Sequence, residues 1–372
     1  MAKYIFANGV NNFQGSLTGA HRRYLELIRY LSGENVVTLV CAPLPELDGN
    51  KNIHKINIPT CKIGCLPYSW SGLIHSVRGL KGTATEGYDW AVSFGPWQTF
   101  AFRLAGIKQI LTLLREDTLN YIACAEKNPV KKALKLIYFW IVEAITVRCS
   151  TRMIVQCNDD YKYLLQRHPL LRGQIQKKTF IQKNNVNPSW VSHEGKLALP
   201  ADTKDVVRIA YVASFDNVRK GYDILFPAII RLLEEGYPVR LYVAGEGRQL
   251  EQLKAQYGTR CGITFLGRID NACALLRQVD FSLVPSHRDS CPNTVLEALG
   301  VGTTVYGSKV GGIKDLLPDE FLFADTTEAL YEFLKNKLDH RLWIPDGQEQ
   351  RLLSQSLIFN WGEKIESYMK EA

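Results

Sequence analysis

The sequence predicts an α/β protein with two parallel β-sheets, each covered by helices. Two observations carry this prediction. The chain has 372 residues, which fits two domains of about 150 to 200 residues each. Short β-rich runs also alternate with helical patterns in both halves, as expected of βαβ units. The predicted strands are Tyr4–Ala7, Val36–Cys41, Trp90–Phe94, Gln109–Leu114 and Met153–Gln156 in the first half, and Arg208–Ala213, Val239–Ala244, Ile263–Leu266, Phe281–Val284 and Thr304–Tyr306 in the second.

A polar stretch with few periodic apolar positions, Asn184–Asp205, divides the two halves and is the predicted linker. We therefore expect Rossmann-like domains at residues 1–187 and 188–357. The remaining segment, 358–372, presents Trp361, Ile365 and Met369 at helical spacing and is expected to pack back on the first domain. Open sheets of this kind bind ligands beyond the carboxyl ends of their strands, so the cleft between the facing domains is the predicted site.

Composition indicates a soluble, ordered chain, with 46% apolar and 22% charged residues. The longest apolar run, Leu136–Val142, is far shorter than the roughly 20 residues that cross a bilayer. The amino terminus enters a strand pattern at once, without the apolar region of a signal peptide. Nine scattered cysteines then suggest reduced thiols in a cytoplasmic protein. Cys61 and Cys65 lack the second ligand pair of a zinc site.

The net charge of +8 favours an anionic partner, either a phosphorylated substrate or an anionic membrane surface. Nucleic acid is not expected, because no nucleic-acid-binding motif accompanies the scattered basic residues. Within Pro129–Val147, Lys131, Lys132 and Lys135 adjoin the long apolar run. Two interpretations remain open for this segment: a buried helix, or a helix that rests on an anionic membrane.

The segment Asp289–Glu297, with the sequence Asp-Ser-Cys-Pro-Asn-Thr-Val-Leu-Glu, runs from a strand end through a loop into a helix. Asn293 or a neighbour can cap this helix, and the helix N-terminus at Asn293 and Thr294 suits a diphosphate. Asp289 and Glu297 can then reach one ligand and accept hydrogen bonds from its hydroxyls. The alternative is an ordinary capped helix with two solvated acids.

This segment resembles the E-x7-E signature of the family-4 retaining glycosyltransferases of the GT-B fold, also called glycosyl transferases group 1. The first acid is Asp here, and Ala-Leu-Gly-Val-Gly and Gly311-Gly312 continue the pattern. The resemblance implies that Asp289 holds hydroxyls of the transferred sugar and that Glu297 holds the ribose of the nucleotide. It also implies that catalysis depends on Asp289, Glu297 and Lys220.

Three further positions of the second half match the family's donor-binding elements. Lys220-Gly221 is similar to the family's Lys-Gly pair, in which the lysine neutralises the diphosphate, but Ser214 stands where the family has arginine. Arg219 is the candidate for the missing charge. Gly245, in a Gly-x-Gly turn, and Arg268, beside the nucleobase loop, complete the expected donor site.

In the first half, the polar loop Asn8–Ala20 precedes a predicted helix, His21–Leu31. The family has a Gly-Gly pair here, near the donor phosphate and the acceptor, whereas this chain has Gly19 followed by Ala20. Many relatives also have a histidine where this chain has Arg115. Arg115, Glu116 and Asp117 are the candidates for acceptor binding. For Asn8–Ala20 the alternative is an ordinary loop before a helix. For Arg115–Asp117 it is an exposed charged turn.

The resemblance implies a retaining enzyme that moves a hexosyl group from a nucleotide sugar, UDP- or GDP-linked, to a glycan or lipid-linked glycan in bacterial cell-surface polysaccharide assembly. Its expected place is the cytoplasm or the inner face of the plasma membrane. The sequence contains no Asp-x-Asp motif, so no metal cofactor is expected. Two alternatives remain: a catalytically silent protein that binds a nucleotide sugar or glycan, and a nucleotide-sugar epimerase of the same fold.

Overall fold

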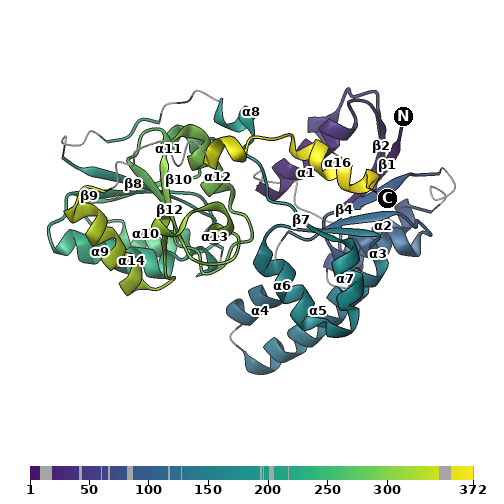
Figure 1. The fold of residues 1–372 in the computed structure, drawn as a ribbon, viewed down its shortest axis with the longest axis horizontal. Coiled ribbons are helices and arrows are strands. Elements are labelled where there is room, and N and C mark those ends of the chain that lie inside the picture. The colour runs from purple at the N-terminus through teal and green to yellow at the C-terminus, as the bar shows by residue number, and fades with distance from the viewer. Residues whose placement is uncertain are drawn as a thin grey trace.

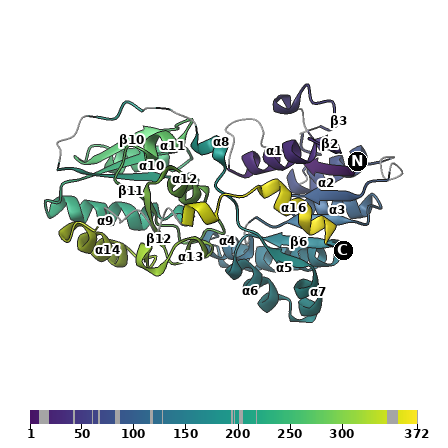
Figure 2. The same cartoon turned by 45° about the horizontal axis from the view of Figure 1, so that its top comes forward.

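Two α/β lobes lie side by side in the structure, and each is built on one parallel sheet (Figures 1 and 2). The structure is a computed structural model, and it describes residues 1–8, 19–41, 44–59, 61–65, 68–81, 87–115, 118–126, 128–192, 195, 197–200, 205–216, 218–342 and 353–371. The predicted fold class, two parallel-sheet domains, is confirmed.

The N-terminal sheet has seven strands in the order β3-β2-β1-β4-β5-β6-β7, and all its pairs are parallel. The strands are β1 Lys3–Asn8, β2 Val36–Cys41, β3 Ile53–Asn57, β4 Trp90–Ser93, β5 Ile110–Leu113, β6 Arg152–Val155 and β7 Thr179–Ile181. The sequence predicted neither β3 nor β7. Both are edge strands whose residues are only partly buried, so they lack a continuous apolar run.

This sheet is buried on both faces, which is why its central strands are apolar at successive positions. In β1, Tyr4 and Phe6 join the cluster below α1, whereas Ile5 and Ala7 join the cluster below α2 and α3. The helices of the domain are α1 Gly19–Leu31, α2 Tyr68–Gly79, α3 Pro96–Leu104, α4 Thr118–Ala125, α5 Pro129–Cys149, α6 Asn158–Arg167 and α7 Arg172–Lys178. Helix α1 already includes Gly19 and Ala20, which the sequence assigned to the preceding loop.

The C-terminal sheet has six parallel strands in the order β10-β9-β8-β11-β12-β13. They are β8 Val207–Val212, β9 Val239–Ala244, β10 Ile263–Gly267, β11 Phe281–Val284, β12 Thr304–Ser308 and β13 Leu322–Phe323. Each predicted strand of this half is present within two residues of its predicted bounds. Only β13 was not predicted, because a strand of two residues shows no periodicity.

Helices surround this second sheet and share one apolar core with it. They are α8 Pro188–Val191, α9 Tyr222–Glu234, α10 Leu250–Tyr257, α11 Ala272–Leu276, α12 Asn293–Val301, α13 Ile313–Leu316 and α14 Thr327–Asp339. Part of the predicted linker is therefore structured. Helix α8 packs on α12, where Val191 contacts Gly300.

The chain crosses between the domains twice, and the two crossings lie against each other. The Val186 backbone N–H donates to the Leu357 carbonyl at 2.9 Å. The Asn185 side chain donates to the Phe359 carbonyl at 2.7 Å. After the second crossing, α16 Trp361–Lys370 returns to the N-terminal lobe and lies on α1 (Figure 1). Its apolar residues join the core below α1, which confirms the predicted C-terminal helix.

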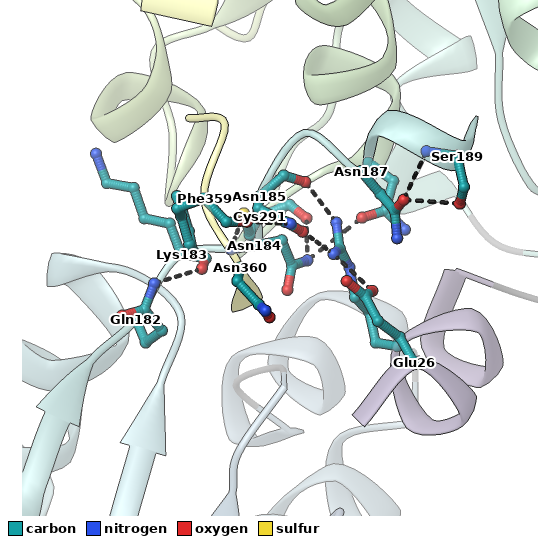
Figure 3. A network of polar contacts seen from close by, with 12 residues as sticks. Glu26, Gln182, Lys183, Asn184, Asn185, Asn187, Ser189, Cys291, Phe359 and Asn360 are labelled. Atoms are coloured by element: carbon teal, nitrogen blue, oxygen red, sulfur yellow. Dashed lines mark hydrogen bonds and ion pairs between the residues drawn. The ribbon is translucent and has the colours of Figure 1, made fainter. Parts of the chain in front are cut away.

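Arg23 of α1 fixes both crossings to the N-terminal domain. Its side chain is fully buried, and its guanidinium donates to the side-chain and main-chain oxygens of Asn185 and to Glu26. The guanidinium also lies over the rings of Trp190, at 4.4 Å from the centroid, and Trp361, at 5.7 Å. Glu26 and Asn185 are labelled among the surrounding residues in Figure 3. Burial lowers the pKa of Arg23, and Glu26 opposes this shift.

Candidate active site

The strand order of the C-terminal sheet places two loops at one point. The connections from β8 and β11 diverge to opposite sides, because β8 is followed by β9 on one side and β11 by β12 on the other. Loops that follow two such neighbouring strands leave a crevice at the carboxyl edge of the sheet. Residues 213–216 and 218–221 follow β8, and residues 285–292 follow β11. They contain the Lys-Gly pair and the first acid that the sequence predicted.

Asp289 and Lys220 form an ion pair across this crevice. The Lys220 Nζ lies 2.6 Å from Asp289 Oδ2, and the aspartate is 8% exposed. Burial opposes ionisation of Asp289, but Lys220 and Arg219 outweigh it and lower the pKa of the carboxyl group. The crevice therefore holds a charged pair at neutral pH, with the ammonium group ready to interact with an anion.

Two glycines hold the backbone that carries this pair. Gly221 caps α9 at φ +75°, and a Cβ on it would lie 1.7 Å from the carbonyl oxygen of Pro285. Gly311 has φ +50°, and its Cβ would lie 2.3 Å from the carbonyl oxygen of Asp289. The Tyr211 hydroxyl also donates to the Lys220 carbonyl at 2.9 Å. Only glycine meets both the dihedral and the space requirement at these positions.

Gly221→Ala should therefore destabilise the protein more than Gly236→Ala, a matched control. Gly236 has a similar φ of +85°, but no atom lies within 4 Å of its ideal Cβ. The control incurs only the backbone cost of about 1 kcal/mol, whereas Gly221→Ala adds a clash with Pro285. Urea denaturation of both variants measures the difference. Equal losses of unfolding free energy would show that the loops at Gly221 and Pro285 move apart and accommodate the added methyl group without cost.

Glu297 lies in the second turn of α12 and faces the N-terminal domain. Its carboxylate is 3.5 Å from the guanidinium of Arg22, which belongs to α1. Burial raises the pKa of Glu297 to about 7, although Arg22 and Arg23 oppose the shift. The carboxyl group is therefore partly protonated at neutral pH. The sequence could not reveal this contact, because nothing in the pattern of one helix specifies a partner in the other domain.

The N-terminus of α12 differs from the predicted capped helix. Pro292 occupies the cap position and offers no side-chain hydrogen bond, so the predicted side-chain cap at Asn293 or a neighbour is wrong. Asn293 is the first helical residue, and its Oδ1 accepts from the Asn184 side chain at 3.3 Å. The Thr294 hydroxyl donates to the Val212 carbonyl at 3.3 Å. The first backbone N–H groups of α12 thus have no side-chain cap and can bind an anion.

The other predicted donor residues lie on neighbouring loops of the same domain. Gly245 and Gly247, at φ +140° and +145°, let the loop after β9 lie against Ala213 and Phe215. Arg268 follows β10 and lies 3.7 Å from Glu246. Both Arg268 and Glu246 are about half exposed. Arg268 is therefore partly open to solvent beside Glu246, and its role at the nucleobase stays a prediction.

Ser214, which stands where the family has arginine, donates its hydroxyl to Asp216 at 2.9 Å. The predicted substitute, Arg219, instead lies beside Lys220 in a short 3-10 helix, Val218–Lys220. Its guanidinium is 5.9 Å from the ring of Tyr121 on α4. Arg219 thus faces the N-terminal domain and contributes to the lowered pKa of Asp289.

The predicted residues of the N-terminal domain are only partly described. Gly19 begins α1, one turn before Arg22, and Arg115 follows β5 in a half-buried position. Glu116 and Asp117 lie outside the described residues, as do residues 9–18 of the predicted loop. Of the described residues of α1, Arg22 contacts the C-terminal crevice, and the structure gives Gly19 only its position at the start of that helix. It leaves the acceptor-binding prediction without a described geometry.

Polar contacts also join the two domains beside the crevice, and the sequence did not predict them. Asp160 of α6 contacts Arg288 at 3.3 Å, and Asp159 contacts Lys314 at 2.8 Å. The Asp315 carboxylate accepts from the Asn158 backbone N–H at 2.8 Å. Each pair joins residues far apart in the sequence, so no local signal could have revealed it.

His287 is held in place by two carboxylates of the C-terminal domain. Its ring contacts Asp223 at 2.9 Å and Asp325 at 3.4 Å. The hydrogen bond to Asp223 is the largest cause of a raised pKa of His287. Asp325 also raises this pKa, and burial opposes the shift. Among the residues that the structure describes, no group of three or more His, Cys, Asp or Glu side chains is placed to hold a metal ion.

The two parallel-sheet domains, with helices around each sheet, have the architecture of the GT-B fold. Solved structures agree over the whole chain. Sucrose-phosphate synthase from Thermosynechococcus elongatus has a TM-score of 0.74 at 19% identity, covering 100% of this chain and 98% of that one. HepE from Anabaena, in complex with UDP and glucose, has a TM-score of 0.70 at 14% identity and covers 100% of both.

Sequence comparison finds a family match for the C-terminal domain. Residues 206–340 match the family model described as glycosyl transferases group 1, which confirms the resemblance to that group over the C-terminal domain. Phosphatidyl-myo-inositol mannosyltransferase from Mycobacterium leprae is 28% identical over 179 residues, 45% of this chain and 47% of that protein. The chain spans about a third to a half of the length of such curated relatives.

Proposed function

We propose that the protein is a glycosyltransferase that moves a sugar from a nucleotide-sugar donor to a hydroxyl of a glycan or lipid-linked glycan. The observation that carries this proposal is the cluster of Lys220, Asp289 and the uncapped N-terminus of α12, with Glu297 one turn further along the helix. A cation and a helix N-terminus suit a diphosphate, and two acids suit hydroxyl groups. The match of residues 206–340 supports the same activity.

Each group has a separate role in this proposal. Lys220 and Arg219, with the first N–H groups of α12 at Asn293 and Thr294, offset the charge of the diphosphate. Asp289 accepts hydrogen bonds from the transferred sugar, and Glu297 accepts them from the ribose. Arg22 must then share Glu297 with the ribose or release it. The N-terminal domain supplies the acceptor site.

The proposed reaction retains the anomeric configuration. The acceptor oxygen forms a bond to the anomeric carbon on the face from which the diphosphate departs. The bond between the anomeric carbon and the phosphate oxygen breaks, and the leaving diphosphate keeps the electron pair. The proton of the acceptor hydroxyl passes to a phosphate oxygen. The protein then contributes positioning and charge stabilisation of the leaving group.

A UDP- or GDP-hexose is the proposed donor. HepE, which shares the fold, is solved with UDP and glucose, and this supports a UDP-sugar. Assembly of a cell-surface polysaccharide at the inner face of the membrane is the proposed role. The test is release of nucleoside diphosphate from a panel of UDP-, GDP- and ADP-sugars. Release by the wild type, lost in Glu297→Ala, supports the proposal, whereas no release with any donor or acceptor argues against an enzyme.

Catalysis is proposed to need no divalent metal, because Lys220 and the α12 N-terminus already lie at the crevice. We expect EDTA to change the turnover rate by no more than about twofold, because the proposed catalysis does not use a bound metal ion that EDTA could remove. The measurement is nucleoside diphosphate release with EDTA, Mg²⁺ or Mn²⁺ at equal ionic strength. Activity abolished by EDTA and restored by Mg²⁺ would contradict the metal-free part alone.

Donor binding should tighten as the pH rises from 6 to 8. The pKa of Glu297 is about 7, so its ionised fraction rises from about 0.1 to about 0.9 over this range. Ribose hydroxyls donate to the carboxylate, so the dissociation constant of the donor should fall by up to roughly tenfold. Calorimetric titration measures it. Glu297→Gln is the matched control, and an equal pH dependence in that variant would exclude Glu297 as the titrating group.

A catalytically silent binding protein is the second candidate, and one observation favours it. The side chain at the position of the family's arginine, Ser214, is engaged by Asp216 and carries no charge. One charged contact to the diphosphate is thus absent, a contact of the kind worth about 1.5 to 3 kcal/mol. Calorimetric binding of a nucleotide sugar without turnover, under conditions where several acceptors are offered, would support this candidate.

A further inference from the structure

Helix α5 carries a row of apolar side chains on its outer surface. Val130, Leu134, Ile137, Ile141 and Ile145 follow one another at intervals of three or four residues, and their exposed fractions run from 42% to 67%. Residues at this spacing lie on one face of a helix. We call these five residues the α5 stripe.

The C-terminal half of α5 is also packed against the domain. Val142, Ala144 and Val147 are buried there, and α5 contacts α3, α4 and α7. The helix lies at the lower edge of the N-terminal lobe in Figure 1. The two interpretations that the sequence left open are therefore not exclusive, because part of the helix is buried and a row of apolar side chains is exposed. A surface helix ordinarily places polar residues on its outer face, so an apolar stripe there indicates a binding surface.

The charges on α5 are suited to an anionic partner. Lys131 and Lys135 are exposed and lie one turn apart beside the stripe, and Arg148 is exposed at its far end. Lys135 also contacts Glu126. The one acid of α5, Glu143, accepts from Arg167 and His168 at 2.8 Å and is 16% exposed. The outward charge of the helix is therefore positive. Within the described part of the chain, no helix is both long and apolar enough to cross a bilayer.

We propose that the α5 stripe rests on the surface of an anionic phospholipid membrane. Apolar residues flanked by lysines are the side chains that interfacial helices bury among lipid headgroups. A second protein copy fits less well, because a standard protein interface uses about 20 to 30 residues on each side, and the stripe is a single row on a convex helix.

The position of α5 connects this surface with the proposed function. Helix α4 directly precedes α5, packs on it, and places Tyr121 beside Arg219 at the crevice. Docking through α5 therefore brings the crevice close to the lipid headgroups. If the proposed glycosyltransferase activity holds, a lipid-linked acceptor is the substrate class that this arrangement serves.

Sedimentation with vesicles of phosphatidylcholine, with and without phosphatidylglycerol, tests the membrane surface directly. The wild type should sediment with the anionic vesicles at low salt and much less with neutral ones. Ile137→Ser/Ile141→Ser should lower the partition coefficient about tenfold or more, because two buried apolar contacts are lost. Leu342→Ser is the matched control: Leu342 is 49% exposed, lies in the other domain, and should bind as the wild type does.

Lys131→Gln/Lys135→Gln provides a second variant that changes only exposed side chains and should fold. It should weaken binding to anionic vesicles at low salt and leave the small neutral-vesicle binding unchanged. Equal sedimentation of the stripe variant and Leu342→Ser would overturn the proposal. So would a wild-type dimer, seen by light scattering, that the stripe variant abolishes. Vesicle binding needs no donor, so its failure and the failure of the proposed activity are observed separately.

Discussion

Lys220→Ala should lower kcat for sugar transfer about 100- to 1000-fold. In the proposed reaction the Lys220 ammonium stabilises the charge that develops on the departing diphosphate. Removal of one such group in a preorganised site typically has an effect of this size. The Lys220 Nζ lies 2.6 Å from Asp289 Oδ2 in the crevice, next to the N-terminus of α12. Steady-state assays of nucleoside diphosphate release, with donor and acceptor saturating, measure the loss.

The same substitution also leaves Asp289 buried without its ammonium partner, which should lower the unfolding free energy by about 3 kcal/mol. Lys220→Met/Asp289→Asn separates the two effects. The double variant should recover most of the stability and remain inactive. Lys309→Ala, which removes an exposed lysine from an ion pair with Asp319 in the same domain, is the matched control. A stable, fully active Lys220→Ala would contradict the proposed role.

Arg23→Met should lower the free energy of unfolding by about 3 kcal/mol. The side chain of Arg23 is fully buried, and its guanidinium holds Glu26, both oxygens of Asn185 and the ring of Trp190. Methionine fills part of the space but leaves the Asn185 oxygens without these donors, and a buried polar group without a partner is costly. Urea denaturation, followed by tryptophan fluorescence, measures the change.

Arg29→Met is the control for Arg23, because Arg29 lies on the same helix with an exposed side chain. Its substitution should change stability by no more than about 0.5 kcal/mol. Arg23→Lys should recover little, since an ammonium cannot reproduce the planar fork or the stacking. If Arg23→Met and Arg29→Met were equally stable, the crossings would have to be held by their mutual hydrogen bonds alone.

The parts of the fold that the sequence predicted are those with a local signal. The strands of the C-terminal sheet are buried on both faces, so each is a nearly continuous apolar run. Asp289 and Glu297 could be assigned to a loop and to the helix that follows it, because the flanking strand β11 and helix α12 each have a local apolar pattern. Edge strands β3, β7 and β13 escaped prediction, since half-exposed or very short strands lack this signal.

Contacts between the domains could not be predicted, because they depend on how two bodies are oriented. Arg22 contacts Glu297 because the orientation of the two domains brings α1 opposite α12 across the crevice. The same holds for Asp160 with Arg288. The predicted helix cap at Asn293 failed for a different reason: Pro292 already fixes the cap position, and the Asn293 side chain binds Asn184 of the first crossing instead.

The paired crossings have one more consequence. The chain leaves the N-terminal domain at Val186 and returns at Leu357, and a single hydrogen bond of 2.9 Å joins these two points. The C-terminal domain is therefore an insertion within the N-terminal one, whose core is completed by α16. An inserted domain with adjacent ends can be exchanged as a cassette without changing the path of its host. If the proposed function holds, replacing this one continuous stretch of sequence changes the donor specificity and leaves the N-terminal domain intact.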